Sequence, residues 1–260
     1  MPSRLRPPAL AEAGDIAPLL VPRFVHQARI AVGRGAAILA RTDLAPALTC
    51  AAGLWAHEHP AWVLAALLGT ALAPQDPAAV GPECDIAPTA VLGPRVEIGA
   101  RVRVGPGAVI GYPGFGWATG PSGAIRPVPQ LAGVVIEADV SIGPLCTVDA
   151  GTLVPTRVRR GAKLDAHVHV GHNVDIGAET IVAAQCGFAG SVTIGEGVLI
   201  GGQVGVADHV TVGDRARIAA KSGVISDVPA GATVAGYPAV ARGRWLRALA
   251  RLYRGLAPAG

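Results

Sequence analysis

The chain has 260 residues, of which 51% are hydrophobic but only 4% aromatic, so any core must consist of aliphatic side chains and alanine. Charged residues make up 15%, too few for a disordered chain, and a formal charge of +4 is too small to indicate a nucleic-acid partner. No apolar segment follows the first residues and the longest apolar run, residues 61–73, is shorter than a membrane span. We therefore expect a cytoplasmic protein without a signal peptide and with at most peripheral membrane contact.

Residues 1–84 are predicted to form a small α/β unit. Within it, Ala36 to Ala40 predicts a short strand. An apolar helix is expected from Pro60 to about Leu72, because proline is favoured in the first turn of a helix.

From residue 85 to residue 235 an aliphatic residue recurs at every sixth position, with two interruptions. This spacing predicts a parallel β-helix, in which six residues make one strand and a corner, and eighteen make a full coil. The interior is expected to be too narrow for aromatic rings. The inward positions are Ile86, Leu92, Ile98, Val104, Ile110, Ile136, Ile142, Val148, and then every sixth residue from Val158 to Val224.

The first interruption, residues 112–134, contains glycines, prolines and two aromatic residues, and we expect a loop that projects from the β-helix. Loops of this length are usually functional, although packing between subunits would also explain it. The second interruption is a slip of four residues after Val148.

The four cysteines, Cys50, Cys84, Cys146 and Cys186, form no CxxC pair. Such spacing is typical of reduced thiols, so we expect no disulfide, metal or other cofactor. Cys146 and Cys186 occupy small inward positions of the repeat and are expected to fill the core.

Residues 236–260 follow the repeats and predict a helix with Trp245, Leu249 and Leu252 on one face. Five arginines and no acidic residue accompany them: Arg242, Arg244, Arg247, Arg251 and Arg254. A basic amphipathic helix of this kind suits a membrane surface, an acidic partner or a cap on an oligomer.

Two histidines are predicted to share one side of the β-helix. His172 and His209 belong to hexapeptides 36 residues apart, which is two coils or about 10 Å along the axis. Gly190 follows His172 by eighteen residues and should lie one coil above it. A histidine beneath a glycine N–H could act as a base with an oxyanion donor, and Asp165 could orient its ring. Ordinary surface histidines would produce the same spacing.

A metal site is the other interpretation of the histidines. His167, His172 and His209 could be shared ligands, as in zinc-dependent carbonic anhydrases with this kind of repeat. In that class the lone histidine precedes the close pair, whereas here the close pair comes first. His169 receives no role from the register.

Three stretches resemble one family: GFGWATGPSGAIRPVPQLAGVVIEADVSIG, KLDAHVHVGHNVDIG and CGFAGSVTIGEGVLIGGQVGVADHV. The family is UDP-3-O-(3-hydroxyacyl)glucosamine N-acyltransferase, of lipid A biosynthesis, and the resemblance covers roughly residues 84–240. It implies a left-handed β-helix, a homotrimer, and transfer of a 3-hydroxyacyl chain from acyl carrier protein to the C2 amine of a UDP-linked glucosamine.

Carried over residue by residue, the resemblance makes His172 the catalytic base, Asp165 its partner and Gly190 the oxyanion donor. His209, Phe24 and Gln130 are implied to bind substrate. The acidic carrier is implied to contact the C-terminal helix, through Arg244, Arg247 and Arg251.

The sequence departs from the family near its start, where the unit before the repeats is shortened. Phe24 occupies the place of one nucleotide-stacking aromatic residue, but Pro18 replaces the other and Val21 replaces an asparagine. Two further functions therefore stay open: a coenzyme A-dependent sugar O- or N-acetyltransferase, and a non-catalytic hexapeptide scaffold.

Overall fold

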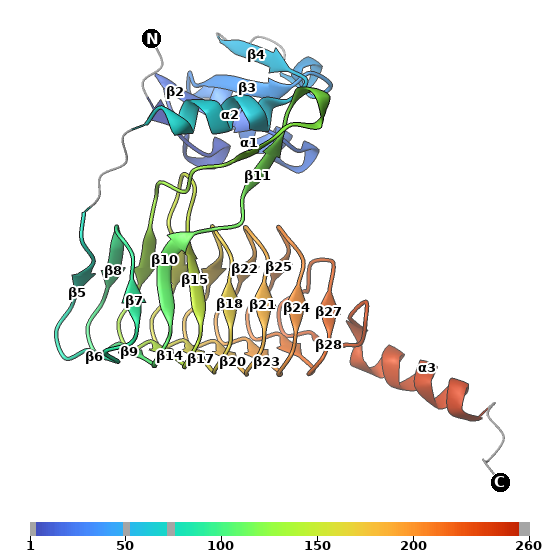
Figure 1. Ribbon diagram of the computed structural model, residues 1–260. Coiled ribbons are helices and arrows are strands. Elements are labelled where there is room, and N and C mark those ends of the chain that lie inside the picture. Colours follow the sequence, from blue (N-terminus) through green and yellow to red (C-terminus); the bar gives the residue numbers. More distant parts are fainter. Residues whose placement is uncertain (1–3, 49–52, 72–75, 255–260) are drawn as a thin grey trace. The chain divides into compact units, whose positions relative to one another are not determined.

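The computed structural model describes residues 4–48, 53–71 and 76–254, which fall into two compact units (Figure 1). The first unit comprises the described residues of 1–74 together with 115–131 and 152–154. The second comprises those of 75–114, 132–151 and 155–260.

The first unit is an α/β structure, as the sequence predicts. Its parallel sheet has the order β1 (Arg4–Leu5), β2 (Asp15–Leu19), β3 (Ala37–Arg41) and β4 (Leu54–His57). Its helices are α1 (Val25–Gly33) and α2 (Pro60–Gly69), and its 3-10 turns are η1 (Pro8–Leu10), η2 (Pro22–Phe24), η3 (Ala45–Ala47) and η4 (Pro121–Gly123). The predicted strand at residues 36–40 is confirmed by β3. The predicted helix begins at Pro60 but ends at Gly69, and residue 72 lies outside the described residues.

The insert is not a bare loop. Strands β11 (Trp117–Thr119) and β12 (Ile125–Pro127) form an antiparallel hairpin that belongs to the first unit. The Arg126 guanidinium lies 3.9 Å from the ring centroid of Trp62 in α2, and Gly120 leaves no space beside that ring for a side chain. Contacts with α2, which lies more than forty residues earlier in the chain, give the insert its structure.

The second unit is a β-helix with three faces (Figure 1). Each face is a sheet of strands from successive coils, and these strands pair in parallel except for β28 and β29. The first face contains β5 (Ala79–Val80), β8 (Val96–Ile98), β13 (Val134–Ile136), β16 (Thr156–Val158), β19 (Asp175–Ile176), β22 (Thr193–Ile194) and β25 (Thr211–Val212). The second contains β6 (Asp85–Ile86), β9 (Arg103–Val104), β14 (Ser141–Ile142), β17 (Lys163–Leu164), β20 (Ile181–Val182), β23 (Leu199–Ile200), β26 (Arg217–Ile218), β28 (Thr233–Ala235) and β29 (Val240–Ala241). The third contains β7 (Val91–Leu92), β10 (Val109–Pro113), β15 (Thr147–Ala150), β18 (His169–Val170), β21 (Gly187–Phe188), β24 (Gly205–Val206) and β27 (Gly223–Val224).

The β-helix therefore starts one strand before the predicted boundary at residue 85, since β5 already pairs with β8. The two interruptions of the repeat also differ from the prediction. Residues 115–131 and 152–154 both leave the β-helix and join the first unit, so that the four-residue slip is a second short excursion.

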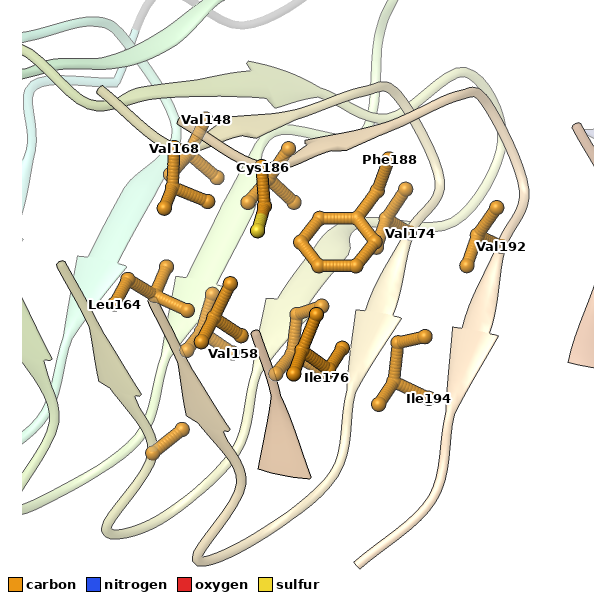
Figure 2. Packing of buried hydrophobic residues seen from close by; sticks show 14 of the residues in the cluster. Val148, Val158, Leu164, Val168, Val174, Ile176, Cys186, Phe188, Val192 and Ile194 are labelled. Carbon is orange, nitrogen blue, oxygen red and sulfur yellow. The ribbon is translucent and has the colours of Figure 1, made fainter. Parts of the chain in front are cut away.

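The interior is filled by the residues that recur every six positions, which the structure buries together with the small residues between them. Figure 2 shows this packing around Val158, Ile176 and Ile194. The expectation that no aromatic ring fits is wrong at Phe188, whose side chain is fully buried. Its register partners in the adjacent coils are Val170 and Val206, which are smaller and leave space for the ring.

The C-terminal segment forms a helix, α3 (Arg242–Arg254), after the antiparallel pair β28–β29. The described helix is shorter than the predicted tail, and residues 255–260 lie outside the described part. Within residues 4–48, 53–71 and 76–254, none of the helices has the length and apolar character needed to cross a bilayer.

Candidate active site

The candidate site lies at the corner of the β-helix between the third face and the first. The backbone hydrogen bonds confirm the predicted stacking of coils there: Ser191 N–H donates to the His172 carbonyl at 2.8 Å, and His209 N–H donates to the Gly190 carbonyl at 3.1 Å. Gly190 is therefore one coil from His172, and His209 belongs to the coil after it. His209 has a left-handed backbone (φ 59°), one residue further into its corner than His172.

The imidazole of His172 lies directly against Gly190. A Cβ atom on Gly190 would be 2.5 Å from Cε1 and 2.6 Å from Nε2 of His172, closer than real Cβ contacts allow. Only glycine therefore fits this position with the ring where it is. Among the described residues, no acceptor takes a hydrogen bond from the Gly190 N–H, so this donor is available next to the ring.

The tautomer of the neutral ring follows from its contact with Asn173. Nδ1 of His172 is 3.1 Å from Oδ1 of Asn173, and an amide oxygen only accepts hydrogen bonds. With the amide in this orientation, Nδ1 of neutral His172 carries the proton and Nε2 carries the lone pair. The Asn173 N–H in turn donates to Oγ1 of Thr156 at 2.9 Å, which holds the corner in place. Nε2, the nitrogen next to Gly190, is thus the basic one.

The acidic residue beside His172 is Asp149 and not Asp165. Asp165 follows β17 at the corner between the second and third faces, and its Oδ1 accepts from the Ala166 N–H at 2.7 Å. One hexapeptide separates it from His172 along the chain, and one hexapeptide is one face of the coil. Within a single chain the structure therefore does not bring Asp165 to His172, and the predicted pairing stays a prediction.

Asp149 was missed because of the four-residue slip. β15 pairs with β18 so that Val148 is level with Val170, although 22 residues separate them instead of eighteen. Asp149, the next residue along, is therefore one coil from the residues around His172. The register of the inward positions on both sides of the slip contained the information needed to find it.

His169 also lies next to Asp149. Its Nε2 is 3.9 Å from Oδ2 of Asp149, and its Nδ1 is 2.7 Å from Oγ1 of Thr147. Burial raises the pKa of Asp149 above its usual value, while the nearby His169 and His172 act in the opposite direction. The register assigns His169 no role, and the structure adds that its ring lies beside Asp149.

The metal interpretation requires His167, His172 and His209 to converge. His167 lies at the corner between the second and third faces, one corner away from the other two. In the described part of the chain, no group of three or more His, Cys, Asp or Glu side chains is arranged to hold a metal ion.

The other predicted substrate-binding residues lie in the first unit. Gln130 is buried: its Nε2 donates to the Val128 carbonyl at 2.9 Å and its Oε1 accepts from Oγ1 of Thr152 at 2.6 Å. One end of this amide bonds within the insert and the other bonds Thr152, and the predicted role of Gln130 in substrate binding stays a prediction. Phe24 is half-buried, with the Arg23 guanidinium 5.4 Å from its ring centroid, and its role stays a prediction.

The predicted carrier-binding residues Arg244, Arg247 and Arg251 are all exposed on α3. The helix is connected to the β-helix through Trp245, whose ring lies so close to Gly236 that no side chain would fit there. Five arginines and no acidic residue make α3 strongly cationic.

Two cysteines fill the β-helix core, as the repeat predicts. Cys146 and Cys186 are buried free thiols in the β-helix core, where burial raises the pKa of each. Cys50 lies outside the described residues.

Comparison with known proteins agrees with this architecture. The family model of the bacterial transferase hexapeptide (six repeats) matches residues 191–226. A UDP-N-acetylglucosamine acyltransferase from Bacteroides fragilis 9343 has a similar structure, with a TM-score of 0.58 and 21% identity over 72% of this chain and 79% of that one. The predicted left-handed parallel β-helix is confirmed.

Two curated relatives share the name UDP-3-O-acylglucosamine N-acyltransferase. The one from Anaeromyxobacter dehalogenans (strain 2CP-C) is 50% identical over 182 residues, which is 68% of this chain and 51% of the relative. The one from Caulobacter vibrioides (strain NA1000 / CB15N) is 55% identical over 148 residues, covering 57% of this chain and 43% of the relative. The chain thus carries the bacterial transferase hexapeptide repeat and, spanning about half of their length, is similar to the UDP-3-O-acylglucosamine N-acyltransferases.

Proposed function

We propose that the chain is an N-acyltransferase that moves an acyl group from a thioester to the C2 amine of a UDP-linked acylated glucosamine, in lipid A biosynthesis. The observation that supports the proposal is the contact between the His172 ring and Gly190, whose backbone N–H donates no hydrogen bond among the described residues. The names of the relatives supply the acceptor.

The chemistry requires one proton acceptor and one oxyanion donor. The amine nitrogen attacks the thioester carbonyl while Nε2 of His172 accepts a proton from it. The Gly190 N–H stabilises the negative charge on the carbonyl oxygen of the tetrahedral intermediate. Collapse of the intermediate breaks the C–S bond, and the proton on His172 passes to the departing thiolate.

The proposal also gives roles to three other predicted residues. His209, at the same corner as His172, contacts the substrate or the pantetheine of the donor. Phe24 stacks on the uracil, and Asp165 reaches His172 from a second copy in a homotrimer. The sequence resemblance supports these roles, and the separation of Asp165 from His172 within one chain is what makes a second copy necessary for the last of them.

The proposed acyl donor is 3-hydroxyacyl-acyl carrier protein, which would place the reaction in the cytoplasm. The acidic carrier fits a helix with exposed Arg244, Arg247 and Arg251. The alternative donor is coenzyme A, whose phosphates are also anionic. The steps need no metal or other cofactor, and activity is expected to survive treatment with a chelator.

A panel of donors and acceptors tests the proposal directly. Purified protein is incubated with acyl-carrier and acyl-coenzyme A thioesters and with UDP-linked or free amino sugars, and the products are identified by mass spectrometry. An amide product from the carrier thioester and a UDP-linked acceptor is the expected result. Products from acetyl-coenzyme A alone would establish the alternative enzyme, and no product from any pair would favour a binding scaffold.

A further inference from the structure

A buried carboxylate lies beside the proposed base without being bonded to it. Asp149 directly follows the inward residue Val148 in β15. It is only 9% exposed, although an acidic side chain is costly to bury. The site described above leaves this charge without a function.

The position of Asp149 relative to His172 is defined by Gly114. A Cβ atom at Gly114 would be 3.2 Å from Oδ2 of Asp149, and 2.7 and 3.2 Å from Cβ and Cδ2 of His172. The carboxylate and the carbon edge of the ring therefore border the same small space. Gly114 has no side chain to separate them.

Neither nitrogen of His172 faces this carboxylate. Nδ1 is engaged by Asn173 and Nε2 lies on Gly190, so that Cδ2 is the edge directed toward Asp149. The arrangement is not a hydrogen-bonded acid–histidine pair. Asn173 orients the ring but carries no charge, and Asp149 carries a charge that acts on the ring through space.

Three titratable groups face Asp149 from neighbouring segments. Tyr112 of β10 is its register partner, His169 of β18 is 3.9 Å away, and His172 follows β18. Thr147 fixes His169 through the 2.7 Å contact with Nδ1, which leaves Nε2 directed toward Asp149. The carboxylate is thus shared between two imidazoles, only one of which lies on Gly190.

We propose that Asp149 is a positioning residue whose negative charge stabilises protonated His172 during acyl transfer, and that His169 competes for that charge. The role of His172 as a base rests on the proposed function, whereas the electrostatic coupling between Asp149 and His172 does not. When His172 takes the proton from the amine, the imidazolium forms next to a carboxylate that is already partly desolvated. The charge favours proton uptake without a bond that would turn the ring away from Gly190.

The signs of the expected changes follow from this arrangement. Replacing Asp149 by Asn keeps the shape of the side chain and removes the negative charge, so the pKa of His172 should fall. Replacing His169 by Gln removes the competing imidazole, so the pKa of His172 should rise.

The test measures the pKa of His172 itself by NMR titration of histidine-labelled full-length protein, with the His172 signal assigned from His172→Gln. We expect Asp149→Asn to lower this pKa and His169→Gln to raise it. Asp139→Asn, an exposed acid paired with Arg101 at another corner, should leave it unchanged. An unchanged His172 pKa in folded Asp149→Asn protein would overturn the proposal.

Kinetics provide the second readout. If the protein has the proposed activity, Asp149→Asn should reduce kcat about tenfold, move the acidic limb of the kcat/KM profile to lower pH, and leave KM near its original value. A large rise in KM with an unmoved limb would overturn the proposal and assign Asp149 to binding of the substrate ammonium. Because the NMR titration needs no substrate, failure of the acyltransferase assay leaves the test of the coupling intact.

Discussion

His172 has a different neighbour on each edge of its ring: Asn173 at Nδ1, Gly190 at Nε2 and the space of Gly114 at Cδ2. Asn173 orients the ring, Gly190 leaves room beside Nε2, and Asp149 supplies a charge across the space at Gly114. The inward side chains are elsewhere in the coil, so changes to these three should affect chemistry more than folding.

We expect His172→Ala to slow acyl transfer by about 10² or more, the usual loss on removing a general base. The side chain is only half-buried and makes no core contact, so thermal unfolding should change little. His209→Ala should be milder and raise KM for a substrate. Steady-state kinetics beside circular dichroism checks both variants, and near-normal turnover of folded His172→Ala protein would place the chemistry elsewhere.

Gly190→Ala tests the close approach of the ring. The new Cβ would be 2.5–2.6 Å from the His172 ring and would displace it, and displacement of about 1 Å costs about 10² in rate. Gly190 does not have a left-handed backbone, so alanine adds no backbone strain. The matched control is Gly205→Ala, where nothing lies within 4 Å of the new Cβ and activity should persist. Equal losses in the two variants would contradict the prediction.

At the scale of elements, α3 separates four of its five arginines from the apolar face of Trp245, Leu249 and Leu252. With about 100° between successive residues, Leu249 and Leu252 lie within about 40° of Trp245. Arg244, Arg247, Arg251 and Arg254 lie about 100–180° away from Trp245. The arginine side is open to solvent, and such exposed charges act over about 8–10 Å at ordinary ionic strength.

Changing Arg244, Arg247 and Arg251 together to Glu should weaken use of an acyl-carrier donor while hardly affecting a small pantetheine thioester. The reason is electrostatic: the carrier protein has an acidic surface that α3 can attract, whereas the small pantetheine thioester lacks that surface. KM for each donor at low and high salt is the measurement. Arg103→Glu, on the second face, serves as the control. If both donors suffer equally, α3 has a structural role instead.

At the scale of the whole molecule, the outward faces of the β-helix expose aliphatic side chains. Val91, Ile181 and Leu199 are 55%, 50% and 36% exposed in the single chain. Such residues on flat strands are typical of surfaces that another subunit covers.

We therefore expect a homotrimer of roughly 78 kDa, three times the mass of 26.1 kDa. Light scattering coupled to size exclusion at micromolar concentration measures it. A stable monomer would contradict the trimer, and with it the delivery of Asp165 from a second copy.

The six-residue spacing was enough to predict the β-helix, its inward residues and the stacking of Gly190 on His172, because these depend only on strand alternation and a constant coil length. It placed Phe188 at an inward position, but the narrow interior was expected to exclude a ring, and the spacing did not predict the hairpin at 117–127. Those depend on which residues lie in adjacent coils or in α2, which no local pattern contains.

Asp149 shows the same limit at the site. A constant eighteen-residue coil pairs His172 with residue 154, whereas the three residues 152–154 leave the β-helix and bring Asp149 into the neighbouring coil instead. Asp165, seven residues from His172 along the chain, lies at another corner. Distance along the chain determines position within a regular coil, but an excursion from the coil changes which side chains meet, and that is visible only once the chain is folded.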